Sequence, residues 1–592
     1  MIRAFATADI REAEYALVQK APTDQLMKKA AGAVAETCAQ LVSVRRGASV
    51  AASPTSRGAA TGRVVALVGG GDNGGDALYA LAFLARGGTR TDAVILSEHP
   101  HERGLRAAEA AGVTIHRPDL AEAPRRLAVS VARVVSGCDV VVDGLVGTGA
   151  SGALREPLSS VVDVLAQALR DAGSRLGRGH RLGGDEHRHA GSTGQPAKRP
   201  HVVAVDIPSG LGGEDGQVAG PHLVADVTVT MGAVKPSALL APACYSVGQV
   251  RVCDLGLPLP PSVAKVTSLE AGDVGCILEA PNQRDHKYTR GVVAVLAGSR
   301  EYPLTGVMCV EAAARAGAGM VRYFGPDEAA LAVLTRIPEV VTARGRFQSA
   351  LVGPGLASQD EQRVAEAREI VRQAKAAHLP VVIDAGALDA WNRLLATVPE
   401  QLPGPQAVLT PHAGEAARLL SRLGEGRTRG GVSRAEVEER PAYWAGVLAK
   451  ETGCVIVCKG AATTICAPSG DLVVQRHAPA WTGTAGSGDV LAGTIASVLA
   501  GGQARAEQAG RQLSQSDLVQ AAAAGVWLHG QAARIACGLD PYAQPIGYIA
   551  GHEIPTPEPP GAGAPIVATD IAEALPRAVS LALAAGPLRY AG

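Results

Sequence analysis

The stretch RVVALVGGGDNGGDALYALAFLARGG, residues 63–88, decides the fold of the first part of this chain. Residues 63–68 form a Val-rich apolar run typical of a buried strand, and residues 76–88 have the pattern of a helix that ends at glycine. The glycines between them permit a tight turn, and the free N–H groups at the start of the helix suit a phosphate. This strand, turn and helix predict an α/β domain with a parallel sheet.

The alternation of strand and helix continues downstream. Further strands are expected at 91–96, 139–147 and 201–210. We therefore expect an N-terminal Rossmann-like three-layer αβα domain over residues 1–257. Residues 171–200 interrupt the pattern because they are polar, basic and glycine-rich, and they are interpreted as a flexible insertion. His187 and His189 within it are interpreted as solvated, since no cysteine or second spaced pair supports a metal site.

A second α/β pattern follows a linker that is expected at 258–280. Its strands are expected at 291–298, 349–352, 378–386, 406–415 and 454–460. With the helices between them, these strands predict a second αβα domain over residues 281–592. A chain of 592 residues also exceeds the roughly 250–300 residues that one core supports, so two large domains are expected.

Composition narrows the class of protein. Lys and Arg together number 56, as do Asp and Glu, so bulk attraction to nucleic acid or to an anionic membrane is not expected. No run reaches the roughly 18 apolar residues of a membrane helix, and the first residues do not resemble a signal peptide. The ten cysteines include no CxxC pair and are interpreted as reduced. We expect a cytoplasmic protein.

Polar residues stand at the ends of three expected strands in the first domain. Asp72 and Asn73 follow the first strand, Asp143 and the turn 147–149 follow another, and Asp206 and Ser209 follow a third. The carboxyl ends of parallel strands meet at one edge of a sheet, where ligands bind in open α/β folds. The sequence therefore predicts a binding site there.

One alternative for this edge is a dinucleotide-binding site. Gly69, Gly71 and Gly74 satisfy the spacing G-x-G-x-x-G, and Glu98 lies where a ribose-binding acid is expected. The motif by itself is weak evidence for such a site, and it does not require the neighbouring Asp72 and Asp76.

The second domain carries the segment WTGTAGSGDVLAGTIASVLA, residues 481–500. Gly486-Ser487-Gly488 precede Asp489 where a helix begins, so backbone N–H groups can bind an anion beside a carboxylate base. A simple helix cap would not require glycines on both sides of the serine.

The first-domain segments GGDNGGD (70–76), VDGLVGTG (142–149) and VDIPSG (205–210) resemble the NAD(P)HX epimerase family, the YjeF N-terminal type. The resemblance covers residues 1–257. It implies a potassium ion between Asn73, Asp143 and Ser209, and Asp206 as the acid/base residue beside the hydrated nicotinamide. The implied substrate contacts are Asp72, Asn73, Gly74, Gly75, Asp76, Gly147, Thr148, Gly149 and Asp206. The family usually has asparagine at the position of Asp72.

The second domain is similar to the ribokinase-like superfamily at 486–489. Four further segments resemble one family of this superfamily, the ADP-dependent NAD(P)HX dehydratases. They are LVGPGL (351–356), VVIDAGAL (381–388), LTPHAGEAARL (409–419) and VCKGAATTI (457–465). The resemblance implies that Asp489 is the base. It implies ADP contacts at Lys459, Gly460, Ala461, Ala462, Thr463 and Gly488, and substrate contacts at Thr305, Gly355, His412 and Asp489. The family commonly has aspartate where this chain has Gly386.

Together the resemblances imply a bifunctional enzyme that acts on NADHX and NADPHX. It would epimerise the R form to the S form and use ADP to dehydrate the S form to NAD(P)H, with release of AMP and phosphate. Mg²⁺ is expected without assigned ligands, and a homo-oligomer is expected. The alternative is a ribokinase-like small-molecule kinase fused to a non-catalytic nucleotide-binding module.

Overall fold

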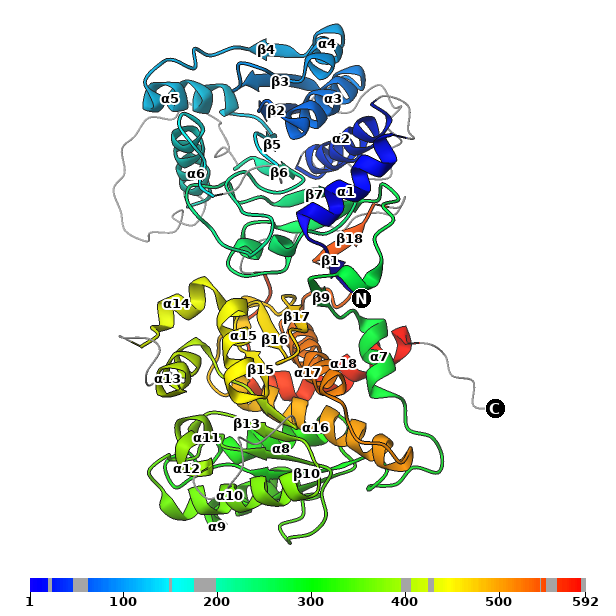
Figure 1. The fold of residues 1–592 in the computed structure, drawn as a ribbon, viewed down its shortest axis with the longest axis vertical. Coiled ribbons are helices and arrows are strands. Elements are labelled where there is room, and N and C mark those ends of the chain that lie inside the picture. Colours follow the sequence, from blue (N-terminus) through cyan, green and yellow to red (C-terminus); the bar gives the residue numbers. More distant parts are fainter. Residues whose placement is uncertain are drawn as a thin grey trace, which may run out of the picture. The chain divides into compact units, whose positions relative to one another are not determined.

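The computed structural model describes residues 1–19, 24–45, 62–147, 152–174, 199–395, 406–423, 431–543, 545–549 and 562–586. The chain forms two compact units, which we call the N-terminal unit (Ala4–Ala264 and Gln544–Pro557) and the C-terminal unit (Met1–Arg3, Lys265–Ala543 and Glu558–Gly592). Both are α/β, as expected (Figure 1). Thr148, Gly149 and most of the predicted 171–200 insertion lie outside the described residues.

The N-terminal unit is built on an eight-stranded sheet of order β18-β8-β7-β6-β5-β2-β3-β4, and the neighbouring strands run parallel. The strands are β2 (Arg63–Val68), β3 (Arg90–Ile95), β4 (Thr114–His116), β5 (Val140–Gly144), β6 (His201–Val205), β7 (Val227–Met231), β8 (Gln249–Cys253) and β18 (Ile546–Tyr548). The helices are α1 (Thr7–Val18), α2 (Gln25–Arg45), α3 (Asp72–Arg86), α4 (Glu102–Ala110), α5 (Pro124–Val135) and α6 (Leu158–Ser174).

Alternating strand residues create the three layers of this unit. Val64 and Val142 pack under α2, α3 and α4, whereas Val65 and Val141 pack under α5 and α6 on the opposite face. Side chains alternate between the faces of a strand, so a strand that is covered on both sides must be apolar throughout. This requirement explains the unbroken Val-rich runs of the sequence.

The C-terminal unit has a ten-stranded sheet of order β1-β9-β17-β16-β15-β14-β13-β12-β10-β11. Strands β10 to β15 pair in parallel with one another, and β16 is antiparallel to both β15 and β17. The strands are β1 (Ile2–Ala4), β9 (Val266–Ser268), β10 (Val292–Leu296), β11 (Met320–Tyr323), β12 (Ser349–Val352), β13 (Val381–Ile383), β14 (Ala407–Leu409), β15 (Val455–Cys458), β16 (Thr463–Cys466) and β17 (Leu472–Gln475).

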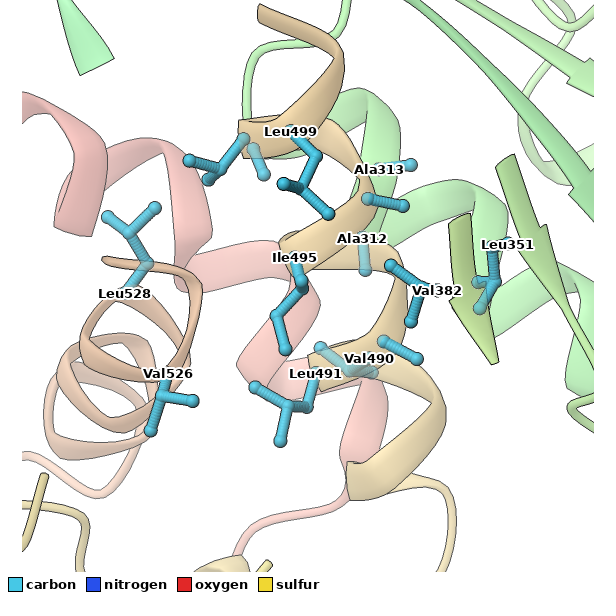
Figure 2. Close-up of a cluster of buried hydrophobic side chains, with 14 of the residues drawn as sticks. Ala312, Ala313, Leu351, Val382, Val490, Leu491, Ile495, Leu499, Val526 and Leu528 are labelled. Atoms are coloured by element: carbon cyan, nitrogen blue, oxygen red, sulfur yellow. The ribbon is translucent and has the colours of Figure 1, made fainter. Parts of the chain in front are cut away.

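Helices cover both faces of this second sheet. One face packs against α8 (Thr305–Arg315), α16 (Ser487–Gln508), α17 (Gln515–Ala536) and α18 (Ala568–Ala585). The other packs against α10 (Glu361–Ala376), α11 (Gly386–Asp389), α12 (Trp391–Leu395), α13 (Ala413–Leu423) and α15 (Pro441–Thr452). The remaining helices are α7 (Ala271–Leu278), α9 (Asp327–Arg336) and α14 (Arg434–Glu439). Figure 2 shows side chains of α16, among them Leu491 and Ile495, in the cluster shared by α8, α17 and the sheet. This packing fixes the helix whose first turn carries Asp489.

Two short strands depart from a simple division of the chain near residue 257. β1, at the start of the chain, lies at the edge of the C-terminal unit's sheet, and the Met1 ammonium binds Glu270 at 2.6 Å and Asp273 at 2.7 Å. β18 pairs with β8 in the N-terminal unit. The expected linker 258–280 is also wrong in its second part, because it contains β9 and α7. Each of these elements is short and has little periodicity to reveal it. In the described residues no helix is long and apolar enough to cross a membrane.

Candidate active sites

The glycine turn between β2 and α3 is shaped by close packing. A Cβ at Gly69 would lie 1.8 Å from the Leu145 carbonyl oxygen, and one at Gly74 would lie 2.2 Å from the Gly69 carbonyl oxygen. Gly75 is buried against His101 and Met27. These contacts explain Gly69, Gly74 and Gly75, whereas a Cβ at Gly71 would meet nothing within 4 Å. Asp72 at the start of α3 stays exposed. The turn therefore brings the end of β2 against the end of β5.

Asp143 and Ser209 are hydrogen-bonded at this edge of the sheet, and Asn73 lies beside the nearby Gly147. Asp143 is fully buried and accepts hydrogen bonds from Ser209 N at 2.8 Å and Ser209 Oγ at 2.6 Å. Asn73 Nδ2 donates to the Val205 carbonyl at 2.6 Å, and its Oδ1 would lie 2.4 Å from a Cβ at Gly147. Gly147 is thus needed for the close approach of Asn73.

Asp143 is a buried carboxyl group without a cation. Burial raises its pKa, the hydrogen bonds from Ser209 and Leu145 oppose this rise, and no side-chain cation pairs with it in the part of the chain that the structure describes. A buried charge is costly unless it is paired. Hard cations are bound by oxygen ligands, and Asn73, Asp143 and Ser209 all carry side-chain oxygen atoms. The residues present therefore fit a hard monovalent cation.

Asp206 follows β6 in a left-handed conformation with φ of 69°. Its Oδ1 accepts hydrogen bonds from Lys235 Nζ and from Met231 N, the latter at 3.1 Å. Lys235 is 2% exposed and also donates to the Met231 carbonyl at 2.8 Å and to Thr230 Oγ1 at 3.1 Å. No motif in the sequence singles out this lysine. Its position, in the turn that follows β7, was the available signal.

Further carboxyl groups face the same place. Burial raises the pKa of Asp76 well above its usual value, and the nearby carboxylates of Asp206, Asp72 and Glu14 add to the rise. Asp76 Oδ1 has no hydrogen-bond partner among the described residues. Burial likewise raises the pKa of Glu14, a residue of α1 that the sequence reasoning did not single out. The site thus holds a paired carboxylate at Asp206 and a carboxyl at Asp76 that favours the neutral form.

The Asp206–Lys235 pair gives a prediction for stability. Replacing Lys235 by methionine is expected to lower the free energy of unfolding by about 3 kcal/mol, because it leaves Asp206 buried without its cation. The double variant Lys235→Met/Asp206→Asn should recover most of this loss. Denaturant unfolding of the single and double variants at pH 7 measures the coupling, and losses that simply add would show that the two groups are independent.

In the C-terminal unit, Gly486 and Ser487 set the geometry at the start of α16. Gly486 has φ of 84°, and a Cβ there would lie 2.3 Å from Met308 Sδ. Ser487 Oγ lies 3.1 Å from His529 Nε2, and burial lowers the pKa of this histidine to about 4, so it is neutral at pH 7. Only glycine permits this entry into the helix, whose first turn presents Asp489.

Asp489 belongs to a charged cluster around Lys459. Lys459 Nζ lies 2.8 Å from Asp384 Oδ1 and 3.8 Å from Glu415 Oε2. Burial would lower the pKa of Lys459, but these carboxylates outweigh it, so the pKa is raised and the ammonium stays charged. Burial raises the pKa of Asp489 to about 7; Asp384 adds to this and Lys459 opposes it. Asp489 is therefore poised to exchange a proton near neutral pH.

The turn after β15 is held at both ends. Lys459 N donates to the Pro411 carbonyl at 2.8 Å, and Thr463 Oγ1 donates to the Gly460 carbonyl at 2.9 Å. Ala461 is exposed, whereas Ala462 and Thr463 are buried. A Cβ at Gly488 would lie 3.4 Å from Lys459 Nζ. The predicted nucleotide contacts thus gather around the lysine, and Gly460 and Ala461 are exposed in the turn.

His412 forms a parallel β-bridge with Lys459. Its backbone N–H donates to Glu415 Oε2 at 2.8 Å, and its Nδ1 accepts from Gly414 N at 3.0 Å, so the residue also caps α13. Gly355, with φ of 65°, packs against Thr305 at the start of α8, and a Cβ there would lie 3.0 Å from Thr305 Oγ1. His412 is thus placed with Lys459, and Gly355 with Thr305.

Two α/β units, each with a buried polar cluster at the ends of its parallel strands, define a two-site enzyme of the nucleotide-handling class. Residues 23–237 match the family described as "YjeF-related protein N-terminus", and residues 293–541 match the family described as "NAD(P)H-hydrate dehydratase". The chain belongs to the family of bifunctional NAD(P)H-hydrate repair enzymes.

Curated relatives place the whole chain in this family. The chain is 36% identical to the bifunctional NAD(P)H-hydrate repair enzyme of Mycobacterium leprae strain TN, over 85% of this chain and 90% of that protein. The enzyme of Mycobacterium tuberculosis strain H37Rv gives the same values. The enzyme of Escherichia coli K12 is 31% identical over 79% of this chain and 80% of that protein. The similarity therefore spans both units.

Proposed function

We propose that this chain repairs hydrated nicotinamide nucleotides at two sites. The N-terminal unit epimerises R- to S-NAD(P)HX, and the C-terminal unit dehydrates S-NAD(P)HX at the expense of ADP. The observation that carries the proposal is Asp489, a carboxyl with a pKa of about 7 in the first turn of α16, beside the charged Lys459.

The dehydration follows from these groups. Asp489 takes the proton of the substrate's 6-hydroxyl, whose oxygen attacks the β-phosphorus of ADP and displaces AMP. The phosphate ester then eliminates phosphate, and the adjacent ring carbon releases a proton to solvent, so that the C=C bond of the dihydronicotinamide ring is restored. Lys459 and the N–H groups at the start of α16 stabilise the charge on the transferring phosphoryl group. Phosphorylation turns a poor leaving group into a good one.

The nucleotide contacts are proposed at Lys459–Thr463 and at Gly488, and those to the hydrated ring at Thr305, Gly355 and His412. The exposure of Gly460 and Ala461 beside Lys459 supports the first set. Mg²⁺ is proposed to accompany ADP, without assigned ligands. A homo-oligomer in the cytoplasm is proposed as well; the ten free cysteines, nine of them buried, are consistent with a reducing compartment.

The epimerisation is proposed at Asp206. This carboxylate moves a proton at the hydrated ring while Lys235 holds it in place, and Asp76 offers a neutral carboxyl nearby. Asp72, Asn73, Gly74, Gly75 and Gly147 are proposed to contact the substrate. A potassium ion held by Asn73, Asp143 and Ser209 would compensate the charge of Asp143 and attract the substrate's phosphates.

Replacing potassium by lithium at constant ionic strength is expected to slow epimerisation severalfold, because the oxygen cage around Asp143 then holds a smaller ion. Dehydration of pure S-NADHX serves as the internal control and should not change. The rates are measured in the same preparation by resolving the two epimers chromatographically over time. Equal epimerisation rates in the two salts would contradict the assignment of this ion.

The products of the nucleotide reaction test the function against the kinase alternative. With pure S-NADHX and ADP, the full chain is expected to release one AMP and one phosphate for each NADH formed. A small-molecule kinase would consume nucleotide without forming NADH, and phosphate would stay on the product. Chromatography of the nucleotides with a phosphate assay distinguishes these results.

A further inference from the structure

A basic groove adjoins His412 on the C-terminal unit. The groove has a volume of about 590 Å³, and its lining includes His412, Ser421 and three arginines, Arg418, Arg422 and Arg434. Arg418 and Arg422 are four residues apart on α13, so they project from the same side of this helix, and Arg434 begins the adjoining α14. His412 is therefore both a proposed substrate contact and part of the lining of the groove.

The arginines outnumber the acids that hold them. Arg418 binds both carboxylate oxygens of Asp389, at 2.9 and 3.2 Å, and Arg422 lies 3.5 Å from the same group. Arg434 pairs with Glu438 at 2.7 Å and is 72% exposed. Two carboxylates therefore pair with the three guanidinium groups, and Glu415 acts on Arg418 without a direct contact. The guanidinium groups are oriented and retain donors for an anion.

The arginines of the groove act electrostatically on His412 at the proposed reaction site. Burial lowers the pKa of His412, and Arg418 and Arg434 are among the cations that lower it further, against the opposing effect of Glu415. An anion in the groove would therefore lie within the same electrostatic environment as His412. Arginine forks match phosphate geometry, and the hydrated dinucleotide carries its phosphates some distance from the reacting ring.

We propose that this groove binds a phosphate group of the hydrated dinucleotide, with Arg434 and Arg418 as its contacts. The inference rests on the proposed dehydratase function and adds a subsite for the substrate to it. The phosphate comes from the pyrophosphate, which NADHX and NADPHX share, or from the 2′-phosphate, which only NADPHX carries. The ADP lies at Lys459 and does not use the groove.

The test compares Arg434→Ala with Arg372→Ala in the full chain. Arg372 is a matched control, because it is an exposed arginine that pairs with a glutamate on its own helix, α10, away from the site. Steady-state rates at saturating ADP are measured with S-NADHX and with S-NADPHX. Arg434→Ala should raise KM for the dinucleotide about tenfold and leave kcat and the KM for ADP within twofold, whereas Arg372→Ala changes none of them.

The pattern of KM values identifies the phosphate. An increase for both dinucleotides assigns the pyrophosphate, and an increase for S-NADPHX alone assigns the 2′-phosphate. Unchanged KM values for both would overturn the proposal. A wild-type chain that forms no NADH at all would instead refute the proposed dehydratase function, so the two failures are distinguishable.

Arg418 provides a second variant that keeps its charge. Arg418→Lys retains a cation near Asp389 but loses the planar fork, and it should raise KM less than Arg434→Ala does. The KM of the wild type should also rise with ionic strength, and that of Arg434→Ala should rise less steeply. Parallel salt dependences in the two proteins would contradict a phosphate contact at Arg434.

Discussion

Replacing Asp489 by asparagine is expected to lower the turnover of S-NADHX by about 10³-fold, because the amide cannot accept the proton of the hydroxyl. ADP binding should change little, since the amide is nearly isosteric and Lys459 remains. Steady-state turnover and calorimetric titration with ADP measure the two effects. Full turnover in this variant would contradict the role of Asp489.

Asp327→Asn is the matched control. Asp327 also lies in the first turn of a helix, α9, but it is exposed and away from the charged cluster around Lys459. Its replacement tests whether the loss of an acid from a helix start is sufficient to lower turnover, and it should leave turnover unchanged.

The substitution Asp489→Asn is also expected to raise the free energy of unfolding at alkaline pH. The pKa of Asp489 is about 7 in the folded chain against a usual value of 3.8, so the folded state binds more protons between these values. The free energy of unfolding therefore falls as pH rises from about 4 to about 7, and above pH 7 the ionised group destabilises the fold. Asp489→Asn should melt at a higher temperature than the wild type at pH 8, with a smaller difference near pH 4.

Turnover depends on pH in the opposite direction to the free energy of unfolding. Turnover of S-NADHX by the wild type should fall as pH drops below about 7, because protonated Asp489 cannot act as a base. A group that is needed for chemistry thus costs stability under the conditions in which it works. A wild-type rate that stays flat from pH 8 to pH 5 would show that another group is the base.

Replacing Asp206 by asparagine is expected to lower epimerisation by about 10³-fold and to leave the dehydration of pure S-NADHX unchanged. Asparagine adopts the left-handed conformation of residue 206 nearly as well as aspartate, so the backbone should not change. Its amide can still accept a hydrogen bond from Lys235 but cannot take up a proton. Chromatographic resolution of the R and S forms measures the first rate, and absorbance at 340 nm with ADP measures the second.

Asp215→Asn is a suitable control for this variant. Asp215 lies in an exposed turn of the same unit, where it binds Gln217. Epimerisation at the wild-type rate in Asp206→Asn would show that Asp206 is not the acid/base residue. Loss of both epimerisation and dehydration in Asp206→Asn would show that the two sites do not work independently.

The sequence was most informative where local geometry demands particular residues. The Val-rich strands are covered on both faces, and the glycines at 69, 74 and 486 allow approaches that a Cβ would block. Asp143 and Ser209 were expected to meet because parallel strands end at a common edge, and they are hydrogen-bonded. These features follow from periodicity and from the topology of a parallel sheet.

Other features depend on tertiary contacts that no local pattern records. Lys235 resembles any loop lysine until the fold buries it against Asp206. Glu14 belongs to an amphipathic helix and faces the site only because α1 packs there. The strands β1 and β18 contain three residues each, too few for a periodic signal, and their partners are distant in sequence. His412 was expected as a substrate contact, and its role as the cap of α13 was not anticipated.

The most direct test of two repair activities on one chain is absorbance at 340 nm with a mixture of R- and S-NADHX. In the presence of ADP we expect recovery of the full NADH signal, and without ADP we expect none. Recovery that stops at the S fraction would contradict an active epimerase site around Asp206. No recovery with ADP would contradict the dehydratase site at Asp489 and favour a small-molecule kinase.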